Sequence, residues 1–205
     1  MKTVFIDFDN TIAESNKKII DILNLKYNIS KTEKDLQDYN FASIVPISVL
    51  EKVQLFESDE FFTELELKEG FIDFYNKYKD VLDIVVVSIG SEANLNKKSE
   101  WIRANISNDI KFQGITSTDE GKSSINMQDG LQIDDCTNSL KTNALIKVLY
   151  KSGNNYDWQQ DFTNTDIIVV NSWDEISEII DFYLEYDYKT LVRLGDDDCE
   201  EDNTI

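Results

Sequence analysis

The sequence predicts an α/β protein built on a parallel sheet, and two observations lead to this class. Short apolar runs typical of buried strands recur along the chain, and stretches with the apolar spacing of helices fill most of the gaps between them. This alternation favours three layers, with helices on both faces of a parallel sheet. One long interval after the first apolar run breaks the pattern and predicts an insertion.

The expected strands are apolar, β-rich runs that end in polar or turn-forming residues. In chain order they are 3–9, 84–88, 110–115, 131–135 and 167–171. The expected helices follow strands and space their apolar residues three or four positions apart. In chain order they are 69–78, 91–106, 137–149 and 172–183.

The interval 14–66 contains helix-like segments, many aromatic residues and the only proline, Pro46, but no convincing strand. An insertion of this length is too long for a simple crossover. We therefore expect a helical cap over the carboxyl end of the sheet, with residues 1–13 and 67–190 as the core. Residues 195–205 read as a solvated acidic tail.

Composition excludes several classes of protein. The 205 residues carry a net charge of −20, which argues against a nucleic-acid polymer as partner because phosphate backbones need a basic footprint. The chain has no histidine, which removes Ser-His-Asp triads, Cys-His pairs and zinc metalloprotease helices. No apolar run is long enough to span a membrane, and two unpaired cysteines without metal or redox spacing fit a reducing cytoplasm.

The first strand ends in two carboxylates, Asp7 and Asp9, followed by Thr11. Residues two apart on a strand point the same way, so these charges repel unless a cation joins them. The carboxyl ends of parallel strands are also where α/β proteins bind ligands. The motif indicates a Mg²⁺ site with one carboxylate free as a nucleophile, although an ordinary Asx-rich turn is the alternative.

The second expected strand ends at Ser88, followed by Ile89, Gly90 and the start of a helix near Ser91. The Ser88 hydroxyl and the backbone N–H of Ile89 could hold an anion beside a helix N-terminus. The alternative is that Ser91 merely caps the helix and Ser88 satisfies a neighbouring carbonyl.

A later strand ends in two adjacent acids, Asp134 and Asp135, and the loop before it carries Lys122. Adjacent buried carboxylates need a cation or hydrogen-bond donors, although Asp135 could also serve as a helix N-cap. Lys122 could hold a nearby carboxylate ionised and balance a phosphate, whereas a lone loop lysine is usually a solvent-exposed charge.

Taken together, these residues resemble, in order and context, the four motifs of the haloacid-dehalogenase-like (HAD) hydrolase superfamily, over about residues 3–185. Two further segments are similar to the 5′(3′)-deoxyribonucleotidases, namely 55–70, with its Phe-Phe, Leu-Glu and Gly, and 98–102, with its Lys-x-x-Trp-Ile. The resemblance implies a Rossmann-like core and a phosphoryl-transfer site. The matching residues are Asp7, Asp9, Thr11, Ser88, Lys122, Asp134 and Asp135.

The resemblance implies a role for each residue. Asp7 would attack phosphorus to form an aspartyl-phosphate, and Asp9 would protonate the leaving oxygen and then activate water. Ser88, Ile89 and Lys122 would hold the phosphate. Mg²⁺ would sit on Asp7, the Asp9 carbonyl and one of two further carboxylates, Asp134 or Asp135. The second aspartate, Asp9, favours phosphate esters as substrates. The leaving oxygen of an ester needs a proton, whereas a halide leaving group does not.

The sequence departs from that family in two places. The run after Ser88 has no basic residue where the family has one, and Asn10-Thr11 stands where the family often has Gly-Val. Tyr27, Tyr39, Phe41 and Phe56 are aromatic residues of the expected cap that could stack on a base or form the cap's core.

The predicted function is a cytoplasmic, Mg²⁺-dependent phosphomonoesterase acting on nucleoside monophosphates, that is, a 5′(3′)-deoxyribonucleotidase. The alternatives are a phosphatase of other small esters such as sugar phosphates, and a non-catalytic member that binds a nucleotide or a protein. We expect no membrane partner, and the sequence leaves a homodimer open.

Overall fold

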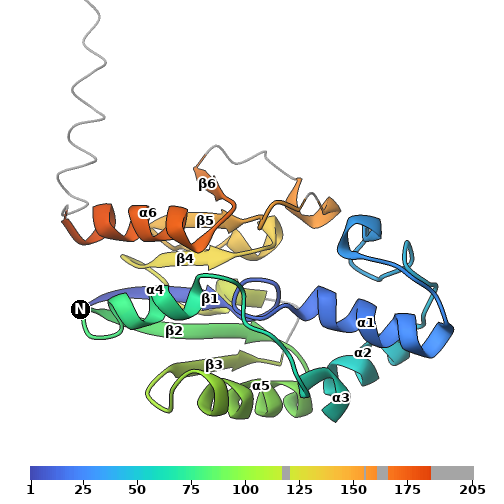
Figure 1. The fold of residues 1–205 in the computed structure, drawn as a ribbon. Coiled ribbons are helices and arrows are strands. Elements are labelled where there is room, and N and C mark those ends of the chain that lie inside the picture. The colour runs from blue at the N-terminus through green and yellow to red at the C-terminus, as the bar shows by residue number, and fades with distance from the viewer. Residues whose placement is uncertain (117–120, 155, 161–165, 186–205) are drawn as a thin grey trace, which may run out of the picture.

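The fold was taken from a computed structural model, which describes residues 1–116, 121–154, 156–160 and 166–185. Six parallel strands form one sheet in the order β3-β2-β1-β4-β5-β6 (Figure 1). The acidic segment 195–205 lies outside the described residues. The strands are β1 (Lys2–Asp7), β2 (Leu82–Ile89), β3 (Lys111–Ile115), β4 (Leu131–Asp134), β5 (Ile146–Tyr150) and β6 (Ile167–Val170).

Six α-helices and four short 3-10 helices connect or flank these strands. The α-helices are α1 (Ser15–Tyr27), α2 (Val49–Glu57), α3 (Asp59–Phe62), α4 (Phe71–Tyr78), α5 (Glu92–Asn105) and α6 (Trp173–Glu185). The 3-10 helices are η1 (Glu33–Asp35), η2 (Gly121–Ser124), η3 (Thr137–Leu140) and η4 (Asp157–Gln159). These counts refer to the described ranges. The predicted α/β class with a parallel sheet is confirmed.

The helix predicted over 137–149 is wrong. Only the short helix η3 forms there, and the end of this range belongs to β5, which pairs with β4 and β6. The sequence did not predict this strand. Side-chain hydrogen bonds fix the non-helical connection between η3 and β5. Thr142 Oγ1 donates to Gln132 Oε1 at 2.6 Å, and Asn143 Oδ1 accepts from Met127 N at 2.8 Å. Such local polar contacts compete with helix formation.

Alternating residues of the central strands enter two separate cores. Val4 and Ile6 of β1 and Val86 of β2 pack in a large cluster with α4, α5 and α6. Phe5 and Val85 point to the opposite face, where the smaller cluster includes Ile115, Ile125 and Met127. This alternation is the period of two expected of a strand buried on both faces.

The segment between β1 and α4 forms α1, η1, α2 and α3 and contains no strand. Figure 1 shows α1 and α2 lying beyond the ends to which β1 and β2 run, so this segment stands over the carboxyl edge of the sheet. The chain leaves and returns side by side, because Glu14 N donates to Glu66 O at 2.9 Å and Lys68 N donates to Ile12 O at 2.8 Å. Among the described residues, no helix has the length and apolarity to cross a bilayer.

Candidate functional site

Sheet register brings the ends of β1, β2 and β4 together. Asp7 pairs with Val87, one residue before Ser88, and Ile6 pairs with Ile133, one residue before Asp134. Because all three strands run parallel, their carboxyl-terminal side chains meet at one edge. The predicted site residues Asp7, Ser88 and Asp134 therefore converge, although they lie far apart in the sequence.

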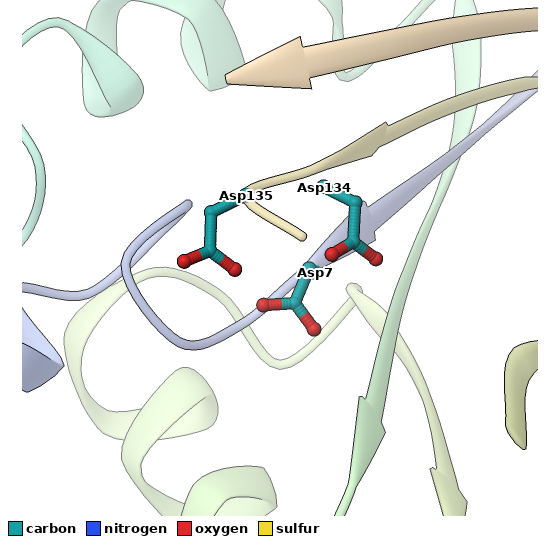
Figure 2. A group of neighbouring side chains, drawn as sticks. All are labelled: Asp7, Asp134 and Asp135. Atoms are coloured by element: carbon teal, nitrogen blue, oxygen red, sulfur yellow. The ribbon is translucent and has the colours of Figure 1, made fainter. Parts of the chain in front are cut away.

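Three carboxylates form the centre of the site. Each of Asp7, Asp134 and Asp135 places one oxygen within 4.8 Å of the others, and all three residues are buried. Figure 2 shows Asp7 at the end of β1 facing Asp134, the last residue of β4, and Asp135, which follows it. Burial raises the pKa of Asp7 to about 7, with Lys122 opposing this rise and Asp134 and Asp9 adding to it. Burial also raises the pKa of Asp135 well above its usual range.

Lys122 lies between two of these acids. Its Nζ donates to Asp7 Oδ1 and, at 2.6 Å, to Asp134 Oδ2, and the residue is only 4% exposed. The lysine is therefore a buried partner of the carboxylates and not a solvent-exposed loop charge. It donates to two of the three carboxyl groups, which leaves an oxygen-rich centre. Hard divalent cations prefer carboxylate oxygens, so the donor set fits Mg²⁺.

The two acids at the end of β4 have different partners. Asp134 Oδ1 accepts from Cys136 N at 3.0 Å, as in a turn, and Asp134 Oδ2 accepts from Lys122. Asp135 Oδ2 accepts from Trp158 Nε1 at 3.1 Å and from Asn10 Nδ2 at 3.3 Å. Asp135 is not the N-cap of the helix that follows, because η3 begins after Cys136.

Asn10 explains one departure from the family pattern. It lies in the left-handed region, with φ of 56°, which glycine and asparagine adopt most readily. Its side chain also accepts a hydrogen bond from Asn16 N at 2.8 Å, which joins the loop after β1 to helix α1. Asparagine therefore meets the backbone requirement of a glycine and adds contacts. Thr11 is fully buried in the same loop, and its carbonyl accepts from Trp173 Nε1 at 3.2 Å.

Asp9 lies outside the carboxylate cluster, at the edge of the neighbouring cavity. Ser15 Oγ donates to Asp9 Oδ1 at 2.7 Å, and Lys98 Nζ donates to Asp9 Oδ2. The Asp9 side chain is 27% exposed, more than that of Asp7. Two donors therefore fix the orientation of this carboxylate, which lines the cavity.

Lys98 is the site residue that sequence reasoning did not single out. Its Nζ donates to Ser88 Oγ at 3.0 Å as well as to Asp9, and the residue is 1% exposed. It thus supplies the positive charge that the run after Ser88 lacks, from the second turn of α5. Ser91 does cap α5, since its Oγ accepts from Asn94 N at 3.2 Å. A lysine on a helix face gives no local signal, and only the Lys-x-x-Trp similarity marked it.

A cavity of about 440 Å³ opens beside Asp9 and Lys98. Ile89, which follows Ser88, lies on its core side. Three of the four aromatics singled out in the sequence line it, namely Tyr39, Phe41 and Phe56. The fourth, Tyr27, lies elsewhere and donates to Glu51 Oε1 at 2.6 Å.

The comparisons with known proteins bear directly on this geometry. A family model described as 5′ nucleotidase, deoxy (pyrimidine), cytosolic type C protein matches residues 1–185. The chain belongs to this family. The family consists of phosphomonoesterases, so the predicted class of enzyme is confirmed. No curated protein sequence matches the chain significantly.

Solved structures agree on the fold of this 5′-nucleotidase family member. A HAD-superfamily hydrolase of subfamily IA from Geobacter sulfurreducens is 12% identical, with a TM-score of 0.54, over 87% of this chain and 96% of the other. The HAD-hydrolase YfnB from Bacillus subtilis, bound to magnesium, is 15% identical, with a TM-score of 0.52, over 87% and 97%. CbbY from Rhodobacter sphaeroides, in complex with phosphate, is 12% identical, with a TM-score of 0.54, over 86% and 96%. These similarities show a HAD-like fold.

Proposed function

We propose that this 5′-nucleotidase family member hydrolyses (deoxy)nucleoside monophosphates through an aspartyl-phosphate on Asp7. The arrangement that carries the proposal is a buried carboxylate, Asp7, held by Lys122 two residues before Asp9, which lines a cavity large enough for a nucleotide. Membership of the family supports the substrate class. The family's description as cytosolic supports a cytoplasmic location.

Mg²⁺ is the proposed cofactor. The three buried carboxylates offer the oxygen ligands it prefers, and Asp7, Asp134 and Asp135 would hold it together with the Asp9 carbonyl. The magnesium bound by the structural neighbour YfnB is in keeping with this assignment. When bound, the ion would supply charge stabilisation for the phosphoryl oxygens.

The protein side chains account for each step of the proposed reaction. An Asp7 oxygen attacks phosphorus, the ester P–O bond breaks, and Asp9 gives a proton to the leaving oxygen. Asp9 then takes a proton from water, whose oxygen attacks phosphorus and breaks the bond to Asp7. Ser88, the N–H of Ile89, Lys122 and Lys98 would stabilise the phosphoryl oxygens throughout.

Residues 14–66 are the proposed cap, with 1–13 and 67–190 as the core. Ala13 and Leu67 pair in an isolated antiparallel β-bridge. This bridge supports the division, because the chain enters and leaves the segment at one place. The segment also supplies Tyr39, Phe41 and Phe56 to the cavity wall. We assign to this segment the binding of the part of the substrate beyond the phosphate.

The test is phosphate release from a panel of deoxy- and ribonucleoside monophosphates and sugar phosphates, with Mg²⁺ or with EDTA. We expect release from nucleotides that needs Mg²⁺ and falls at least about a thousandfold in Asp7→Asn. A preference for sugar phosphates would overturn the nucleotide assignment. No turnover of any ester by folded, Mg²⁺-loaded protein would instead indicate a non-catalytic binding protein.

A further inference from the structure

The cavity beside Asp9 and Lys98 has mostly apolar walls, and a second cation also lines it. Its volume, about 440 Å³, is within the range of small-molecule sites and exceeds what a phosphate alone requires. The apolar wall residues include Tyr39, Phe41, Val53, Phe56, Ile89 and Trp158. Such a surface suits a flat, weakly polar ring system.

This second cation is Lys52, a half-buried residue of α2. Its Nζ donates to the Tyr39 carbonyl at 2.5 Å and lies 3.5 Å from the centroid of the Tyr39 ring. An ammonium has three donors, and this carbonyl uses one of them. Within the described part of the chain, the ion pairs all involve other lysines.

The charges around Lys52 favour a neutral acceptor over a second anion. Asp38 and Asp9 both act on Lys52 electrostatically, so a further negative group entering here would be repelled. The Asp38 carboxylate is itself occupied, since it accepts from the backbone N–H groups of Asn40, Ala42 and Ser43. A carbonyl oxygen on the edge of a planar ring is a neutral acceptor, and the ring fits between the apolar walls of the cavity.

We propose that Lys52 is a specificity-determining residue that donates a hydrogen bond to an exocyclic carbonyl oxygen of the nucleobase. This inference rests on the proposed function, because it requires a nucleoside monophosphate in the cavity. An amino group at the same ring position would turn its own donors toward the ammonium. Lys52 would therefore favour oxo bases and disfavour the matching amino bases.

Two pairs of substrates test this contact. dUMP and dCMP differ at the 4-position of the ring, and dIMP and dAMP differ at the 6-position, each as oxo against amino, with the adjacent ring nitrogen changing from N–H donor to acceptor. We expect wild-type kcat/KM to favour the oxo member of at least one pair by about tenfold to a hundredfold. In Lys52→Met, which keeps the aliphatic stem, this ratio should fall to near one. Lys52→Arg, which keeps a donor, should retain part of it.

Two controls separate this role from others. The loss of turnover in Lys52→Met should be much smaller for 2-deoxyribose 5-phosphate, which has no ring system to reach Lys52, than for dUMP, and Lys34→Met, at an exposed lysine of η1, should leave every ratio unchanged. Loss of 2-deoxyribose 5-phosphate turnover equal to that of nucleotides would place Lys52 at the phosphate and overturn the proposal. An oxo preference that survives in Lys52→Met would overturn it while leaving the proposed function intact. Absence of nucleotide turnover by wild-type protein would overturn the proposed function itself.

Discussion

The indole Nε1 of Trp158 donates a hydrogen bond of 3.1 Å to Asp135 Oδ2. Trp158 belongs to η4, after β5, and its ring also stacks on Tyr156 at 4.3 Å between centroids and meets Tyr39 edge-on at 5.8 Å. One side chain thus touches a proposed metal ligand and an aromatic residue of the segment over the sheet. Outer partners of this kind fix the orientation of ligating carboxylates.

Trp158→Phe should therefore weaken metal binding more than substrate binding. Removing the donor leaves Asp135 with one fewer restraint, so the Mg²⁺ concentration for half-maximal activity should rise about tenfold. Calorimetric titration of the protein with Mg²⁺ should show the same shift without substrate. Tyr156→Phe keeps the stacked ring and should leave both values unchanged. Equal Mg²⁺ affinity in Trp158→Phe and wild type would exclude this role.

Lys98→Met should lower kcat/KM by about a hundredfold to a thousandfold. The substitution removes the donor shared by Asp9 and Ser88 and takes one positive charge from the phosphate subsite. Steady-state kinetics with dUMP provides the measurement. Lys111→Met, at an exposed lysine paired with Asp83, is the matched control and should stay within about twofold of wild type. A Lys98 variant as active as that control would remove Lys98 from the site.

Lys122→Met should destabilise the metal-free protein by about 3–5 kcal/mol, because two buried carboxylates lose their shared partner. Urea unfolding with and without Mg²⁺ measures the effect. Added Mg²⁺ should restore more stability to this variant than to wild type, since the ion replaces the missing positive charge. Lys68→Met removes another buried lysine, paired with Glu14, and should show a loss that Mg²⁺ does not repair. The same response in both variants would contradict a metal site at Asp7.

The oxo-over-amino preference should depend on pH. Desolvation lowers the pKa of Lys52 to about 8, against the opposing effects of Asp38 and Asp9. The ammonium is therefore present below pH 8 and lost as pH rises through about 8, whereas desolvation raises the pKa of the adjacent Tyr39, which stays protonated. The dUMP to dCMP ratio of kcat/KM, which reports the free enzyme, should fall between pH 7 and 9. In Lys52→Arg the ratio should stay flat, and a flat wild-type profile would argue against Lys52 as the donor.

The sequence revealed the parts of the fold that have a local signal. Strands that end in acids, such as β1 and β4, were expected at their observed places, because apolar runs and carboxylates are visible residue by residue. The helix expected over 137–149 failed because Thr142 and Asn143 bond to distant residues, which no local pattern reveals.

The site was only partly visible in the sequence, for the same reason. Lys122 was expected near the acids through a resemblance, whereas Lys98 reaches Ser88 through the packing of α5 against the sheet. Lys52 had no signal at all. Its position depends on how α2 lies over the sheet, and tertiary packing of this kind leaves no periodic trace in one sequence.

The most direct test of the central claim is to look for the phosphoryl group on Asp7. Wild-type protein would be mixed with dUMP and Mg²⁺, quenched in acid within one turnover, and digested with pepsin at the same low pH for mass spectrometry, because an acyl phosphate hydrolyses at alkaline pH. We predict a single added phosphoryl group on the peptides that contain Asp7, and none in Asp7→Asn. Rapid turnover with no modified peptide, or wild-type turnover by Asp7→Asn, would contradict the account.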